Sequence, residues 1–108
     1  GGGTSFSMLR TLDEAYKIQQ LENYSLNPLA SFFWSTMGNA ECLGLQHQIG
    51  TIKTGNYADL IVLNSKSTSL MRHRMEKCKT IEEELFILQT LGDDRAIDSV
   101  FIAGRKIK

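Results

Sequence analysis

The clearest pattern of apolar and polar positions lies in residues 49–64. Two glycines are followed by an Ala-Asp step and then by the four aliphatic residues 60–63, which Asn64 closes. A short unbroken apolar run bounded by turn residues predicts a strand that is buried on both faces. Because Gly55 and Asn56 favour the positive φ angles of a chain reversal, the stretch predicts a local β-hairpin.

A helical period precedes this stretch and predicts a first helix over residues 11–22. Thr11 and Glu14 have the spacing of a capping box, in which the Thr11 hydroxyl accepts from the Glu14 N–H. Asn23 then breaks the pattern. The apolar positions that share one face are Leu12, Ala15, Ile18 and Leu21.

A second helix is predicted over residues 28–43. Asn27 suits the N-cap, and Pro28 suits the first helical position, where no N–H is needed. Gly44 supplies the stop. The helix carries an aromatic stripe that we interpret as core, in preference to a cofactor site. The aromatic residues of that stripe are Phe32, Phe33 and Trp34.

The last third of the chain predicts one more helix and a strand. Thr80 and Glu83 form a second capping box, and the helix that they begin is expected to end at Gly92. A turn at residues 93–95 leads into a strand over residues 97–103, which the following glycine turns back.

The net charge adds little to the predicted elements, but it bears on possible partners. The chain has 108 residues, with 12 basic and 12 acidic side chains, so no overall field attracts nucleic acid or an anionic membrane. We expect neither as a partner. A basic cluster is interpreted as a solvated segment offset by the acidic run at residues 82–84, with phosphate contact as the alternative. Its members are Arg72, His73, Arg74, Lys77 and Lys79.

The sequence contains few candidate metal-binding or catalytic residues. His47 and His73 lack the spacing of a metal site and are expected on the surface. Cys42 and Cys78 are interpreted as two thiols, with one disulfide as the alternative. Asp59 is expected to accept backbone N–H groups where the hairpin closes.

The glycine-rich start of the chain is expected to be a loop. Its residues Gly1, Gly2, Gly3, Thr4 and Ser5 are interpreted as a tight connection, and a backbone cradle for an anion is the alternative. The chain begins at Gly1 and not at Met, which indicates either an engineered start or a piece of a longer protein.

The order of several segments resembles the C-terminal part of the guanine deaminases, a family of zinc amidohydrolases. The resemblance is carried by Gly-Gly-Gly-Thr-Ser-Phe-Ser at residues 1–7 and by Thr-Leu-Gly-Asp-Asp-Arg at residues 90–95. The pattern Gly-x-Ile-x-x-Gly-x-x-Ala-Asp-Leu at residues 50–60 is common to many amidohydrolases. Together these segments extend over nearly the whole chain.

The resemblance implies an α/β fold in two parts. Residues 1–46 would be a loop and the last helices of a (β/α)₈ barrel. Residues 47–108 would be the C-terminal share of a small β-sandwich domain, with one helix at about residues 80–91. The remaining sandwich strands would come from a part of the protein outside this chain, so strand edges are expected to be open.

The resemblance also implies a hydrolase of purine catabolism that deaminates guanine to xanthine and ammonia with zinc. The family's metal ligands and catalytic glutamate match no residue here, and its metal-binding aspartate would come just before Gly1. We therefore expect this fragment to be inactive and without zinc. Only the loop from Gly1 to Ser5 would lie beside the active site. The whole enzyme is expected to be a cytoplasmic homo-oligomer. The alternatives are another amidohydrolase acting on a different amino-heterocycle or cyclic amide, and a non-catalytic binding module.

Overall fold

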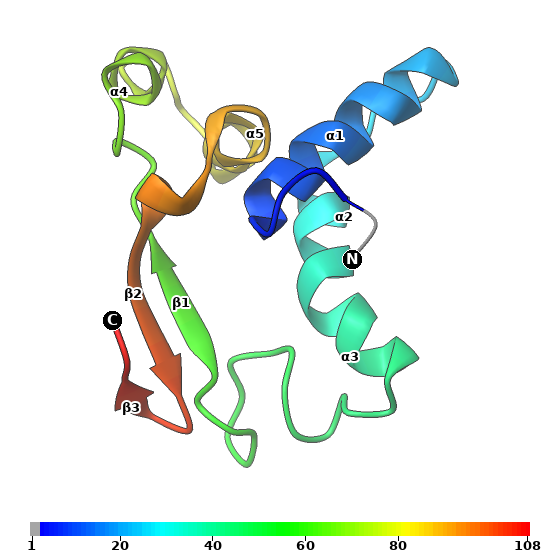
Figure 1. Ribbon diagram of the computed structural model, residues 1–108, viewed down its shortest axis with the longest axis vertical. Helices are drawn as coiled ribbons and strands as arrows, with labels where there is room; N and C mark the ends of the chain where they lie inside the picture. Colours follow the sequence, from blue (N-terminus) through cyan, green and yellow to red (C-terminus); the bar gives the residue numbers. More distant parts are fainter. Residues whose placement is uncertain (1–2) are drawn as a thin grey trace.

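The computed structural model describes residues 3–108 and contains both helices and a small sheet (Figure 1). Its elements in chain order are α1 (Met8–Leu21), α2 (Pro28–Phe33), the π-helical η1 (Trp34–Gly38), α3 (Asn39–Cys42), β1 (Leu60–Leu63), α4 (Ser69–Met75), α5 (Ile81–Leu91), the 3₁₀ turn η2 (Asp94–Ala96), β2 (Ile97–Ile102) and β3 (Arg105–Lys106).

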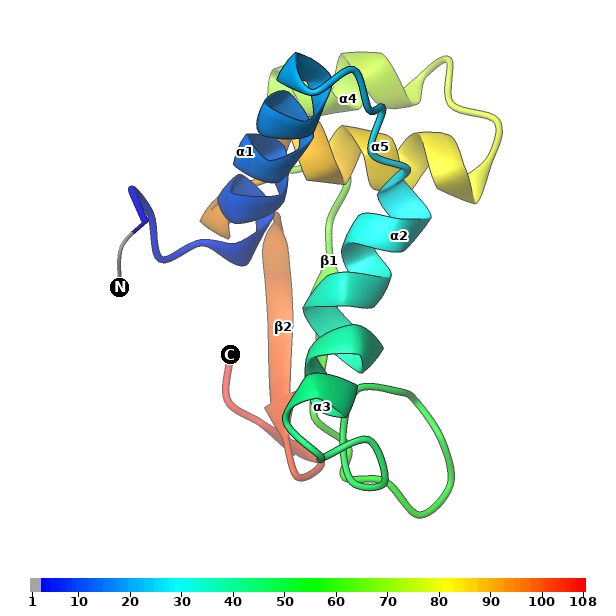
Figure 2. The ribbon, with the colours of Figure 1, turned by 90° about the vertical axis from the view of Figure 1, so that its right-hand side faces the viewer.

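The helices and the sheet meet mainly at one end of the molecule. α1 and the continuous rod α2–η1–α3 lie to one side, the strands lie to the other, and α4 and α5 lie beyond the end of the sheet (Figures 1 and 2). The radius of gyration is 14.5 Å, against about 13 Å for a compact domain of this length. The arrangement is thus more open than that of an average domain.

A small apolar cluster joins these parts. It brings together side chains from α1, α4, α5 and η2, all of them buried. Its buried members are Leu9, Met71, Ile87, Leu88 and Ala96.

The first helix starts earlier than predicted. Ser7 is the N-cap, and its side chain accepts from the N–H of Arg10 at 3.5 Å. The capping box predicted at Thr11 is wrong, since the Thr11 hydroxyl instead donates to the Ser7 carbonyl one helical turn back. Serine is a favourable N-cap residue, and the helix therefore starts after Ser7, one turn before Thr11. The break predicted at Asn23 is confirmed, because that residue has a φ of 59°.

The second helix begins as predicted but changes period in its middle. The Asn27 side chain accepts from the N–H of Leu29 at 2.8 Å, and Pro28 occupies the first turn. The hydroxyl groups of Ser35 and Thr36 both donate to the Phe32 carbonyl. Such side-chain bonds compete with the backbone ladder, which gives a physical reason for the π-helical stretch that follows.

The aromatic residues of this helix are less buried than predicted. Phe32 packs against the core cluster. Phe33 and Trp34 each leave 47% of their surface exposed. The core interpretation is therefore wrong for these two side chains within this chain.

The hairpin predicted in residues 49–64 is wrong. β1 pairs antiparallel with β2, with Leu60 opposite Phe101, and the strand order is β1-β2-β3. Burial on both faces is also wrong, since Ile61 and Val62 are exposed. An apolar run bounded by turns specifies a strand but not its partner, and the partner here comes from the far end of the sequence.

The observed hairpin joins β2 to β3. Its turn consists of Ala103 and Gly104, with φ angles of 48° and 77°, which is the backbone of a tight two-residue reversal. The Asp59 carboxylate accepts from the Ala103 N–H at 2.7 Å. The predicted role of Asp59 as a backbone acceptor is confirmed, but it stabilises this hairpin and not a local one.

At Gly50 the long loop between α3 and β1 packs closely against the helical rod. A Cβ at this position would lie 2.7 Å from the Cβ of Ala40 and 3.1 Å from the Cα of Met37. Its φ of 95° also disfavours any side chain. The first glycine of the amidohydrolase-like pattern is thus required by a backbone contact.

The structure confirms most of the features predicted for α5. The Thr80 side chain accepts from the N–H of Glu83, as in a capping box. Glu83 accepts in turn from the N–H of Lys79, one residue before the expected donor. The helix ends at Gly92, where a Cβ would lie 2.3 Å from the Leu88 carbonyl oxygen.

α4 was not predicted as a helix. Its N-cap is Thr68, whose side chain accepts from the N–H of Met71 at 3.2 Å. Met71 is fully buried and anchors the helix to the core cluster. Met75 at the end of the helix also packs against this cluster. The basic residues that dominate the composition of α4 obscured these apolar contacts.

Gln89 on α5 has a 0% exposed surface. Within the part of the chain that the structure describes, its amide nitrogen and oxygen both lack a hydrogen-bonding partner. A buried amide without partners opposes folding.

Replacing Gly50 tests the packing of the loop against the rod. We expect Gly50→Ala to lower the free energy of unfolding by about 2–4 kcal/mol, because the methyl group meets Ala40 and the φ angle is unfavourable. Gly55→Ala is the matched control: it has the same φ of 95° but no atom within 4 Å of its Cβ position. The control should cost only about 1–2 kcal/mol. Urea unfolding measures both.

A double substitution separates contact from backbone strain. If the Ala40 methyl group is the obstacle, Gly50→Ala with Ala40→Gly should be more stable than the sum of the single changes, by about 1–2 kcal/mol. Additive effects would contradict the proposed contact.

Gln89→Met should stabilise the fold. The change keeps the side chain's length and removes two unpaired polar groups, so we expect a gain of about 1–3 kcal/mol in the free energy of unfolding. Gln48→Met, at an exposed loop position, should stay within about 0.5 kcal/mol of the wild type. A loss of stability in Gln89→Met would mean that the buried amide has a partner in solution.

The sheet should make the isolated chain self-associate. β1 lies at the sheet's edge and carries the exposed Ile61 and Val62, and such edges template pairing with other chains. Ile61→Lys should reduce the association seen by light scattering. Ile18→Lys, at a similarly exposed position on α1, should not. A monomer whose β1 amides are protected from exchange would contradict this prediction.

Candidate functional site

The loop that leads into α1 is the first candidate. Gly1 and Gly2 lie outside the described residues. Gly3 and Thr4 are exposed, and Ser5 is half-buried. The Ser5 hydroxyl oxygen accepts from the Ser7 N–H at 3.0 Å, which fixes the path of the loop just before the helix. The tight connection and the anion cradle both stay predictions for this loop.

The turn after α5 lies next to the start of α1. Leu9 in the first turn of α1 is 5% exposed. A Cβ added to Gly92 would lie 3.1 Å from the Leu9 Cδ1 atom, so the helix directly covers the Gly92 backbone. The loop of residues 3–7 therefore ends where α1 contacts this turn.

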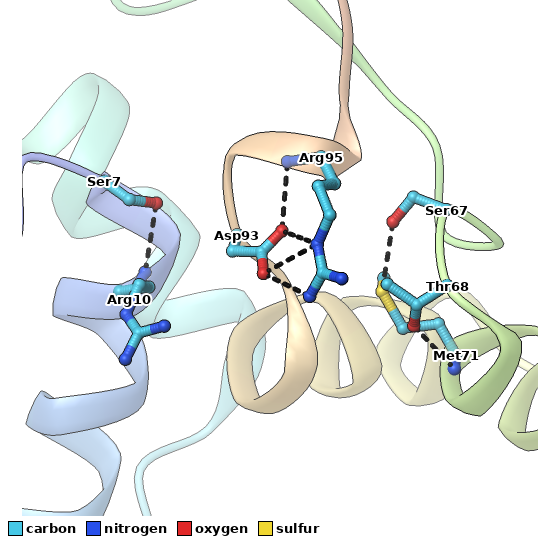
Figure 3. Close-up of polar contacts among 7 residues, drawn as sticks. All are labelled: Ser7, Arg10, Ser67, Thr68, Met71, Asp93 and Arg95. Atoms are coloured by element: carbon cyan, nitrogen blue, oxygen red, sulfur yellow. Dashed lines mark hydrogen bonds and ion pairs between the residues drawn. The ribbon is translucent and has the colours of Figure 1, made fainter.

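Asp93 and Arg95 form an ion pair within the turn (Figure 3). Asp93 Oδ1 accepts from the Arg95 backbone N–H and from Nε, both at 3.0 Å, and Oδ2 accepts from Nη2 at 2.7 Å. The carboxylate thus caps the 3₁₀ turn and binds the guanidinium through both oxygens.

The ion pair with Arg95 shifts the titration of the Asp93 carboxyl group. The side-chain hydrogen bonds from Arg95 lower the pKa of Asp93, and the positive charge of Arg10 on α1 lowers it further. The same hydrogen bonds raise the pKa of Arg95. Asp93 therefore stays ionised, and its ion pair is with Arg95. The sequence marked residues 93–95 only as a turn, although Asp-x-Arg before a strand also fits a side-chain cap.

No metal site can be built from the part of the chain that the structure describes. His47 and His73 are exposed, as predicted. Across residues 3–108, no three His, Cys, Asp or Glu side chains are grouped so that they could hold a metal. These residues therefore do not fit the zinc ion that the resemblance implies. Cys42 and Cys78 are free thiols, which agrees with the preferred interpretation and not with a disulfide.

The acidic run at residues 82–84 forms hydrogen bonds with neutral groups. Glu82 accepts from the Asn27 side chain at 2.7 Å, and Glu84 accepts from the Ser65 hydroxyl at 2.6 Å. The ion pairs found among residues 3–108 join none of the three acidic residues to a cation. The acidic residues instead attach the first turn of α5 to neutral donors.

A groove of about 710 Å³ lies between α4 and α5. Its polar walls carry the cations Arg74 and Lys77 and the carboxylates Glu82 and Glu83, and Phe86 contributes an apolar surface. Charges of both signs balance here, so the groove favours no single class of ligand.

A comparison with protein families matches residues 1–107 to the amidohydrolase family. Guanine deaminase of Escherichia coli (strain K12) is 40% identical over 107 residues, which cover 99% of this chain and 24% of that protein. Probable guanine deaminase of Deinococcus radiodurans is 31% identical, with 96% of this chain and 24% of that protein covered. Human guanine deaminase is 28% identical, covering 98% and 25%.

Solved structures give the same result. E. coli guanine deaminase superposes with a TM-score of 0.94, covering 98% of this chain and 24% of that one. Guanine deaminase from Bradyrhizobium japonicum gives 0.87 at 27% identity, covering 100% and 29%. An adenosine deaminase from Xanthomonas campestris with bound zinc gives 0.73 at 22% identity and shares the fold.

The chain spans about a quarter of the length of the curated relatives that it matches. Its helices and small antiparallel sheet form part of an amidohydrolase fold, which confirms the predicted fold class, and the resemblance to guanine deaminases is confirmed. Because the family match extends over residues 1–107, the chain belongs to the amidohydrolase family.

Proposed function

We propose that this chain is part of an enzyme that hydrolyses guanine to xanthine and ammonia in purine catabolism. The observation that supports the proposal most is the 40% identity to E. coli guanine deaminase, together with a TM-score of 0.94 over 98% of the chain. Two segments carry the resemblance. The described part of the first, residues 3–7, leads into α1, and the second, residues 90–95, includes the turn that α1 contacts.

Within that enzyme, the chain's role would be support and not ligation of zinc. Residues 1–46 would contribute barrel helices, and residues 47–108 would contribute sandwich strands and α5. The loop of Gly1, Gly2, Gly3, Thr4 and Ser5 would lie beside the reaction site. The zinc and the proton-transferring groups would be held by residues from the part of the protein that this chain does not contain.

The same proposal includes a cytoplasmic homo-oligomer that takes guanine as its substrate. The free thiols Cys42 and Cys78 agree with a reducing compartment. Among residues 3–108, no helix combines the length and the apolar character that crossing a membrane requires. Exposed apolar side chains on the sheet and helices supply surfaces for contact with further protein, either more of the same polypeptide or another subunit.

The purified 108-residue chain should bind no stoichiometric zinc and should turn over no guanine. The physical reason is that its described residues bring too few ligands together. Elemental analysis and a guanine-to-xanthine absorbance assay measure both properties, with E. coli guanine deaminase as the positive control. One equivalent of zinc in the isolated chain would contradict this part of the proposal.

A chimera tests the activity itself. We expect E. coli guanine deaminase to keep zinc and guanine turnover when its matching quarter is replaced by this chain, because the two backbones superpose closely. Adenine and cytosine serve as control substrates. A folded, zinc-loaded chimera that prefers another amino-heterocycle would contradict guanine as the substrate. An aspartate encoded just before Gly1, and a His-x-His motif far upstream, would give independent support.

A further inference from the structure

The end of the glycine-rich loop is held by two serines. The Ser5 hydroxyl oxygen accepts from the Ser7 N–H, and the Ser7 hydroxyl oxygen accepts from the Arg10 N–H. The Thr11 hydroxyl also donates to the Ser7 carbonyl at 3.1 Å. The direction in which the loop leaves α1 therefore depends on where the first turn of the helix is held.

That first turn is held from outside the helix. Leu9 is buried in the same core cluster as Leu88 and Ala96, and its Cδ1 atom would lie 3.1 Å from a Cβ at Gly92. The turn after α5 thus limits how far the start of α1 can move in one direction.

Asp93 fixes the shape of the same turn. Its carboxylate accepts from the backbone N–H and from the guanidinium of Arg95. The Asp93 side chain leaves only 15% of its surface exposed, against 65% for that of Arg95. The turn that this pair shapes contains Gly92, over which Leu9 of α1 packs.

We propose that Asp93 is a positioning residue for the loop of residues 3–7. It fixes the turn of residues 92–96 and, through the packing of Leu9 on that turn, the start of α1 from which the loop emerges. The proposal rests on the proposed function in one respect, which is that this loop lies beside the guanine site. Under that function, a loosened loop would impair the orientation of substrate without removing any group that reacts.

Amide exchange tests the link without any activity. In the wild type, the N–H groups of Ser7 and Arg10 both donate to side chains of the loop and cap. Asp93→Ala should speed their exchange by about fivefold to tenfold, which corresponds to losing a cap of about 1 kcal/mol. Asp93→Asn keeps an acceptor for the Arg95 N–H but loses the charge, so its effect should lie between Asp93→Ala and the wild type.

Asp94→Ala is the matched control. Asp94 is an adjacent, exposed carboxylate for which no side-chain hydrogen bond or ion pair is found within residues 3–108. It should leave the exchange of Ser7 and Arg10 unchanged. The amides of Ile87 and Leu88 in α5 report global opening and should change little in all variants. Equal exchange of the loop amides in Asp93→Ala and Asp94→Ala would overturn the proposal, and so would an effect no larger than that on α5.

Kinetics of the chimera then test the consequence for the reaction. Well below the unfolding temperature, Asp93→Ala should lower kcat/KM for guanine about tenfold or more through misorientation, with zinc content unchanged and partial recovery in Asp93→Asn. Unchanged kcat/KM would overturn the link to the substrate. A chimera that never turns over guanine would refute the proposed function instead, while the exchange result would still decide whether Asp93 holds the loop.

Discussion

The apolar contact among α1, α4, α5 and η2 is the constraint on which the rest of the structure depends. Leu9, Met71, Ile87, Leu88 and Ala96 are buried there together. The helical rod and the sheet each extend away from this point (Figure 1). The groove between them is lined by polar residues such as Asn39 and Asp59 and by apolar residues such as Leu43 and Phe101. Burial of apolar surface is the main favourable term in folding, so a cluster this small gives a modest core. It nevertheless sets the positions of two segments, the loop before α1 and the turn before β2.

Close backbone contacts complete that arrangement at two places. Gly50 lets the long loop pack against the helix at Ala40, and Gly92 ends α5 beneath the first turn of α1. A methyl group would meet Ala40 at the first position and the Leu88 carbonyl oxygen at the second. Both glycines belong to the segments that resemble amidohydrolases, so the sequence features that identify the family correspond to packing requirements in this chain and not to reacting groups. The chemistry of the family enters only through the position of the loop of residues 3–7.

The sheet forms by pairing of segments that are far apart in sequence. β1 pairs with β2, which lies more than 30 residues later in the chain. Asp59 joins the β2–β3 turn to the start of β1 and so fixes which ends of the two strands meet. On its other side β1 offers an unpaired edge with exposed aliphatic side chains. A surface of this kind is suited to further strands of a larger protein.

The sequence by itself determined the local elements and the family. Caps at Asn27 and Thr80, the stop at Gly92 and the strand ending before Gly104 depend on neighbouring residues, and the structure confirms them. Only the tertiary structure decided the partner of β1, the exposure of Trp34, the helix around Met71 and the packing of Leu9 over the turn after α5. Each of these depends on residues far away in sequence, and apolar period or turn composition contains no information about which distant residue will supply the contact.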